Sequence, residues 1–176
     1  MKRFLVITLL LATVIEGKPR PVLFGVSGGI GLPKIPISQY RSPISVLGGG
    51  MGHLSIYKKL GVQIDANALT TFSLGSVNNA PGDLRFDVLW GDLALTYRLR
   101  GMLHSQSNLI VGTGHYTVIQ EFNQGREEIQ TQGVNLGISN WMAGRRLRSY
   151  FEVRWHLMFT SGEDPQVLTL TYGILF

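Results

Sequence analysis

The chain has 176 residues, a formal net charge of +5, 44% hydrophobic residues and no cysteine. The length suits one domain, and the lack of cysteine excludes a disulfide framework and thiolate chemistry. The basic residues are scattered, without a basic stripe or an aromatic-interleaved motif, so we expect no nucleic-acid partner. The mean hydropathy of +0.15 is high, yet the apolar residues beyond the N-terminus are dispersed rather than continuous.

The first seventeen residues have the order of a secretory signal peptide. A basic start, Met1-Lys2-Arg3, precedes an almost unbroken apolar run from Phe4 to Ile15, and Gly17 is a small residue at which cleavage could occur. The alternatives are a membrane anchor and a buried helix, but the run is too short to cross a bilayer comfortably. We therefore expect residues 1–17 to be a signal peptide and residues 18–176 to form the mature domain.

Eight segments of the remaining chain carry strand signals and are separated by turn residues. In chain order they cover about 22–31, 44–57, 60–72, 85–99, 108–122, 128–142, 146–159 and 166–176. Ten or more residues match a tilted strand that crosses a membrane. The connections after the first and third segments are long and polar, whereas those after the second and sixth are tight. The facing of the fifth segment stays open, because Gly112 and Gly114 could line either side.

The seventh segment shows most clearly that these elements are strands. Phe151, Val153 and Trp155 fall on one face, whereas Glu152 and Arg154 fall on the other. A helix would scatter these charged residues among apolar neighbours, whereas a strand separates the two sets completely.

The last segment also has two chemically different faces. One face carries Leu168, Leu170, Tyr172, Ile174 and Phe176. The other face carries Thr169, Thr171 and Gly173, with Leu175 as the exception. A soluble protein rarely exposes such a strand, because a free apolar edge invites aggregation. A transmembrane barrel needs it, because the apolar face meets lipid and the edges pair by closure.

These patterns predict an all-β fold, an eight-stranded antiparallel up-and-down transmembrane β-barrel over residues 18–176. Its first connection would face outward, since external loops are longer than periplasmic turns. Aromatic residues should then form two girdles at the water interfaces. Those expected at the periplasmic rim are Phe24, Tyr57, Tyr97, Trp141 and Phe176. Those expected at the outer rim are Phe72, Phe86, Phe122 and Phe159.

Polar and charged side chains are expected to fill the lumen, because eight strands enclose a space just wide enough for side chains. The residues predicted to form this lumen network are Asp65, Asp92, Arg98, Arg148, Glu152, Arg154 and His156. Three acids and three arginines would neutralise one another, as buried charges require. We therefore expect a closed lumen, with a proton or ion path as the alternative.

The stretches from Phe24 to Gly31 and from Leu168 to Phe176 resemble the first and last strands of small eight-stranded outer-membrane proteins of the OmpA/OmpX type. The alternating apolar set Leu168, Leu170, Tyr172, Ile174 and Phe176 also resembles the signal that the barrel-assembly machinery reads. The resemblance implies export through the periplasm to the outer membrane of a Gram-negative cell. It implies contact with outer-membrane lipid and lipopolysaccharide and external loops that could bind a surface ligand. In contrast to the larger OmpA-type proteins, we expect no appended peptidoglycan-binding domain, because the sequence ends with the predicted barrel.

Catalysis and metal binding receive little support from the sequence. The lipid A deacylase family pairs a histidine with a serine two residues later, but His115-Tyr116-Thr117 has threonine at that place. The related palmitoyltransferase family begins with an amphipathic helix, for which residues 18–21 are too short. The four histidines are far apart and lack the spacing of metal ligands. We expect no enzyme activity, no cofactor and no metal.

The expected function is therefore structural or interactive. The barrel would support envelope integrity and present loops for adhesion or surface recognition. A narrow porin-like channel for small solutes or ions is the first alternative. A soluble ligand-binding barrel of the lipocalin kind is another, and it would keep its apolar faces inside and its polar faces outside.

Overall fold

The computed structural model describes residues 22–34, 44–71, 85–102, 105–122, 125–143, 147–161 and 164–176. These ranges contain eight strands: β1 (Val22–Lys34), β2 (Ser45–Tyr57), β3 (Leu60–Thr71), β4 (Arg85–Met102), β5 (Ser105–Phe122), β6 (Gly125–Ala143), β7 (Arg148–Phe159) and β8 (Gln166–Leu175). The predicted strands agree in number and order. The expected signal peptide, residues 1–17, lies outside the described residues. No helix in the described ranges has the length and apolar character needed to cross a bilayer.

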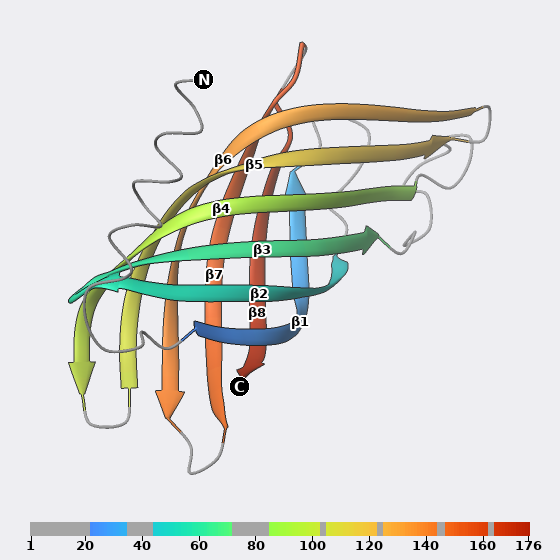
Figure 1. The fold of residues 1–176 in the computed structure, drawn as a ribbon. Helices are drawn as coiled ribbons and strands as arrows, with labels where there is room; N and C mark the ends of the chain where they lie inside the picture. Colours follow the sequence, from blue (N-terminus) through green and yellow to red (C-terminus); the bar gives the residue numbers. More distant parts are fainter. Residues whose placement is uncertain are drawn as a thin grey trace.

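The eight strands form one closed antiparallel barrel, as predicted (Figure 1). Each strand pairs with the next along the chain, and β8 pairs with β1. At this seam Phe24 and Phe176 exchange two backbone hydrogen bonds, with N–O distances of 3.1 and 2.9 Å. Closure leaves no free edge along the seam, which is why a barrel can expose apolar strands without aggregating through them.

The register of the strands fixes the width of the barrel. Following paired residues from Leu23 through β2 to β8 leads back to β1 at Pro33, ten residues further along. With eight strands this offset corresponds to a strand tilt of about 40°. The interior of such a barrel holds side chains and little else.

Large apolar side chains cover the outer wall. On β4, Leu93 and Leu95 are 54% and 62% exposed, whereas Asp92 on the same strand points inward and is 4% exposed. The same alternation runs through β7, where Phe151 is exposed and Glu152 is buried. A soluble ligand-binding barrel would show the reverse arrangement, so that alternative is wrong. The wall is that of a transmembrane barrel.

Aromatic residues gather at the end of the barrel with the tight Lys58-Lys59 turn. Phe24, Tyr57, Tyr97 and Phe176 are exposed there. The ammonium groups of Lys58 and Lys59 lie 5.2 and 5.9 Å from the ring centroids of Tyr57 and Tyr97. This arrangement of amphipathic rings and lysines suits a membrane–water interface.

Two residues predicted for the girdles lie inside the barrel instead. Trp141 and Phe86 are 5% and 1% exposed. Trp141 lies an even number of residues from the inward-facing Asn135 on β6, and Phe86 lies an even number of residues from the inward-facing Asp92 on β4. We call such positions inward parity, and alternation along the strand makes both side chains face the lumen. Phe159 is exposed as expected. Phe72 lies outside the described residues. Phe122 ends β5, and the direction of its side chain lies outside what the structure describes.

The structure settles the facing of β5. Gly112 and Gly114 line the interior, where a Cβ on Gly112 would lie 2.7 Å from the Cβ of Ala94. Tyr116 is therefore buried inside, whereas His115 is exposed on the outer wall.

The strands differ in length, and the long ones extend past the ends of shorter neighbours. β4, β5 and β6 contain 18, 18 and 19 residues, whereas the other strands contain 10 to 13. β6 pairs with β7 only from Gln132 onward, but it continues to pair with β5 up to Gly125. Figure 1 shows the joined ends of β5 and β6 reaching beyond the end of β3.

Candidate functional site

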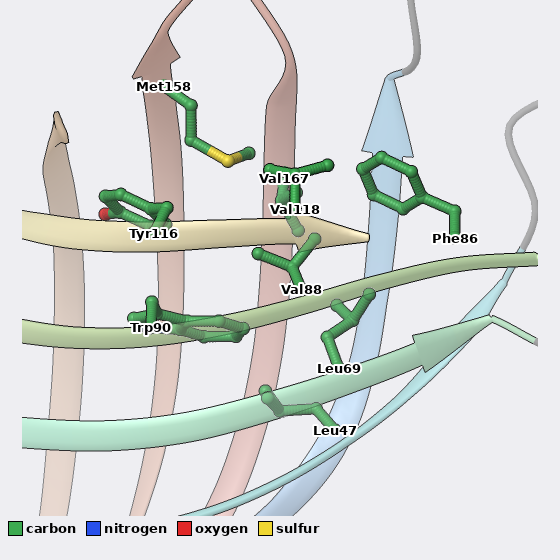
Figure 2. Packing of buried hydrophobic residues seen from close by; sticks show 9 residues of the cluster. All are labelled: Leu47, Leu69, Phe86, Val88, Trp90, Tyr116, Val118, Met158 and Val167. Carbon is green, nitrogen blue, oxygen red and sulfur yellow. The ribbon is translucent and has the colours of Figure 1, made fainter. Parts of the chain in front are cut away.

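The lumen is filled by three layers of side chains. We call the end of the barrel with the 35–43 and 72–84 connections the loop end, and the end with the Lys58-Lys59 turn the turn end. Nine residues form an apolar layer at the loop end (Figure 2): Leu47, Leu69, Phe86, Val88, Trp90, Tyr116, Val118, Met158 and Val167. Four residues form a smaller layer at the turn end: Met51, Trp141, Tyr150 and Leu175. A charged cluster lies between these two layers.

Arg154 is the centre of the charged cluster. Its Nη1 lies 2.8 Å from Asp65 Oδ2 and 2.9 Å from Asp92 Oδ1. Its Nη2 lies 2.8 Å from Glu152 Oε1. The four side chains are at most 8% exposed, so these ion pairs are shielded from water. Gln63 Nε2 donates to Asp65 and Glu152, which connects the carboxylates to one another.

The register of the strands produces this cluster. Asp65 on β3 pairs directly with Asp92 on β4, and both side chains point inward. Arg154 is on β7, across the barrel from β3, so its side chain must span the lumen. Gly137 on β6 is paired with Arg154, and a Cβ there would lie 3.0 Å from the Arg154 Cγ. A glycine at this position therefore leaves room for the arginine stem.

The structure brings together four of the seven predicted lumen residues, namely Asp65, Asp92, Glu152 and Arg154. Arg98 and Arg148 keep their inward parity but lie near strand ends at the turn end. Arg148 is exposed, Arg98 is half-buried, and neither forms an ion pair within the described ranges. The expected balance of three acids and three arginines is therefore corrected: three carboxyl groups surround one guanidinium.

His156, the seventh predicted residue, packs against the loop-end layer and takes no part in the ion pairs of the charged cluster. Its Nδ1 lies 3.0 Å from the hydroxyl oxygen of Tyr116, and its Nε2 lies 3.5 Å from Thr169 Oγ1. Its ring centroid is 5.1 Å from that of Trp90 in an edge-on arrangement. The sequence did not reveal Tyr116 as its partner, because the facing of β5 was ambiguous.

The Tyr116–His156 hydrogen bond gives a first testable prediction. Replacing Tyr116 by phenylalanine should cost about 1–2 kcal/mol, because the ring stays packed while a buried imidazole nitrogen loses its partner. The measurement is urea-induced unfolding of the protein refolded in lipid vesicles. Tyr172→Phe is the matched control, because Tyr172 is 55% exposed on the outer wall and should change stability by less than about 0.5 kcal/mol. Equal losses in both variants would contradict the role assigned to Tyr116.

A second buried histidine lies at the turn end. His53 Nε2 is 3.0 Å from Thr96 Oγ1, and the His53 ring packs edge-on against Trp141 with centroids 4.6 Å apart. Both rings are buried, so this pair helps to close the lumen on the turn-end side of the charged cluster.

Little free volume remains around the cluster. A cavity of ≈ 10 Å³ lies beside Asp65, Glu152 and Arg154. This volume is about that needed for one water molecule, and the cavity is polar enough to hold one. In the described part of the lumen the charged cluster is thus enclosed between the two apolar layers.

The histidines of the described ranges do not gather into a metal site. No group of three or more histidine or carboxylate side chains there is placed to hold a metal ion. His115 is exposed on the outer wall and has no hydrogen bond to a carboxylate among the described residues. The arrangement lacks the acid that would orient a histidine as a general base.

An apolar outer wall around a closed lumen of paired charges defines this protein as a small eight-stranded transmembrane β-barrel. No protein-family model and no curated protein matches the sequence. The structure is similar to Neisserial surface protein A, with a TM-score of 0.70 and 7% identity over 88% of this chain and 95% of that chain. It is similar to the attachment invasion locus protein Ail of Yersinia pestis, with a TM-score of 0.58 and 10% identity over 88% and 97% of the two chains.

A third similar structure is a major outer-membrane protein from Thermus thermophilus. Its TM-score is 0.59, with 13% identity over 89% of this chain and 100% of that chain. These likenesses extend over nearly the full length of each barrel. The predicted resemblance to small eight-stranded outer-membrane barrels is therefore confirmed at the level of the fold.

Proposed function

We propose that this protein is an integral outer-membrane barrel whose lumen is closed and whose role is structural and surface-interactive. The observation that carries the proposal is the filled lumen, in which the Arg154 cluster is enclosed by apolar layers at both ends. A barrel that does not conduct acts through its surfaces. The loop end, where β6 extends past β7, is the surface that would be available outside the cell.

The proposed location is supported by the fold and by two parts of the sequence. Similar barrels carry names such as surface protein and attachment invasion locus protein. Residues 1–17 have the order of an export signal. In β8, Leu168, Tyr172 and Ile174 face outward together with Phe176, as an assembly signal for the outer membrane would require. The partners of this role would be outer-membrane lipid and lipopolysaccharide, the assembly machinery, and a ligand bound at the loop end.

The same geometry argues against the alternatives of a channel and an enzyme. A channel needs a continuous water-filled lumen. The described lumen is blocked on the loop-end side of the charged cluster by Trp90, Tyr116 and Phe86. It is blocked on the turn-end side by Trp141 and Tyr150. An enzyme needs an activated nucleophile, and the described histidines lack the required partners. We therefore propose that the protein is neither.

Conductance separates the closed barrel from a channel. The refolded protein in a planar lipid bilayer should show no steady unitary openings, because no continuous aqueous path crosses the charged cluster in the described lumen. Steady openings that disappear in Glu152→Ala would contradict the closed lumen. Deletion of the gene should meanwhile increase the sensitivity of cells to detergent or reduce their attachment to surfaces, and the wild-type chain should restore both. An unchanged deletion strain would overturn the proposed role.

A further inference from the structure

The loop end of β6 has a backbone edge that no described strand pairs with. The ladder between β6 and β7 begins at Gln132 and Phe159, whereas the ladder between β5 and β6 continues to Phe122 and Gly125. The side chain of Thr131 is buried, and its hydroxyl donates to the carbonyl of Phe159. Residues 125–130 are therefore paired on one side only, as far as the described strands extend. We call this segment the free edge of β6.

The free edge is accessible and firmly supported. Arg126, Glu127, Glu128 and Gln130 are exposed, so side chains of the described residues do not cover them. Ile129 is partly buried and packs against the apolar layer at the loop end. On its other side the segment is held by an uninterrupted ladder to β5. A single strand edge of six residues extends over about 20 Å, which is enough for one short extended peptide.

An unpaired edge offers a row of backbone donors and acceptors to any extended chain, and natural proteins use this for peptide recognition by strand addition. Side chains then decide which chains are accepted. Glu127 and Glu128 give the free edge two adjacent carboxylates on opposite faces of the strand. Arg126 is the one basic residue in the segment, and its guanidinium is already 4.0 Å from the Glu128 carboxylate.

This charge pattern selects among possible partners. A second copy of the same edge, with all six residues paired antiparallel, would place Glu127 opposite Glu128 twice, which is destabilising for directly opposed residues. A strand with lysine or arginine on both faces would place opposite charges against Glu127 and Glu128 and would be favoured.

We propose that the free edge of β6 is a docking site at which an extended, positively charged polypeptide segment of an extracellular partner adds as a further strand. The proposal rests on the proposed surface role, for which it names a site and the chemistry of a ligand. Backbone hydrogen bonds to residues 125–130 would give the contact its register, and Glu127 and Glu128 would give it its preference for basic segments.

The test uses the full-length protein refolded in lipid nanodiscs and two labelled eight-residue peptides rich in valine and threonine. One peptide has two adjacent lysines at its centre, which a strand places on opposite faces, and the other has two adjacent glutamates there. Binding is followed by fluorescence anisotropy at fixed ionic strength, and amide hydrogen exchange is followed in the same samples. We expect the lysine peptide to bind and to slow the exchange of amides in residues 125–130. The glutamate peptide should not bind.

Two double variants separate docking at the edge from general attraction between charges. Glu127→Lys/Glu128→Lys should weaken binding of the lysine peptide by about tenfold or more and should allow the glutamate peptide to bind. Asp87→Lys/Glu121→Lys makes the same change in net charge on β4 and β5, at positions that are paired on both sides. It should retain lysine-peptide binding and the protection of residues 125–130. Heat-modifiable gel mobility shows that each variant has folded.

Three results would overturn the docking site. They are the absence of lysine-peptide binding to the wild-type protein, binding without protection of residues 125–130, and equal weakening in both double variants. None of these results bears on the surface role itself. If cells that carry Glu127→Lys/Glu128→Lys still attach like the wild type while the deletion strain does not, the surface role stands and the ligand binds elsewhere.

Discussion

Arg154→Met is expected to destabilise the folded barrel by about 3–5 kcal/mol. Within the described ranges the substitution removes the one cation that contacts Asp65, Asp92 and Glu152, while methionine retains much of the apolar stem. Three carboxyl groups would then face one another in a lumen with room for about one water molecule, and loss of one partner of a buried ion pair has a cost of this size. Urea-induced unfolding in lipid vesicles measures the change.

Arg148→Met is the matched control for this prediction. Arg148 is on the same strand with the same inward parity, but it is exposed at the turn end and forms no ion pair within the described ranges. Its loss should change stability by less than about 0.5 kcal/mol. If the two variants lost similar amounts, the charged cluster would not be the interaction that holds the lumen together.

The second large effect is expected at Gly29, on β1 beside the seam with β8. A Cβ at this position would clash with the backbone carbonyl of Leu170 and would lie 2.9 Å from the Cα of Thr171. Backbone atoms of a paired strand cannot move aside as a flexible side chain can, so the seam itself would have to open. Gly29→Ala should therefore cost about 3 kcal/mol or more, or prevent closure altogether. Unfolding midpoints and heat-modifiable gel mobility report the two outcomes.

Gly28→Ala is the control for the seam prediction. The Cβ of Gly28 would point to the outer wall, and its nearest heavy atom would be the carbonyl oxygen of Leu47 at 3.7 Å, an ordinary contact. Both substitutions restrict the unfolded chain equally, so the difference between them isolates the clash. A Gly29→Ala barrel as stable as Gly28→Ala would show that β1 and β8 do not approach each other this closely.

Alternation along each strand made most of the fold predictable from the sequence. A period of two assigns each residue to the wall or to the lumen, and a one-residue error would reverse both faces. Phe151, Glu152, Val153 and Arg154 therefore have the directions that the sequence predicted. β5 was the exception, because glycine is compatible with either face and left the direction of Tyr116 open.

The composition of the charged cluster was less predictable. Alternation gives the face of a residue but not its height along the barrel, and height depends on the register with strands far away in the sequence. Arg98 and Arg148 have the predicted parity but lie too close to strand ends to reach Arg154's partners. At Arg98 a register shift in the β4–β5 ladder adds a local irregularity that no sequence pattern predicted. The predictions for Trp141 and Phe86 were wrong for a different reason. Their position near a strand end was given more weight than their place in the inward–outward alternation.

The β1–β8 seam has a kinetic consequence. Every other ladder joins neighbours along the chain, whereas this ladder joins Val26 to Ile174, almost a full chain length apart. The entropy of bringing such distant segments together must be lost before their contacts can form, so high contact order makes this the slow event of folding. Local hairpins should assemble early and leave β1 and β8 as two exposed borders of an open sheet. An unassisted chain is most prone to misassembly during that interval, before the last ladder forms.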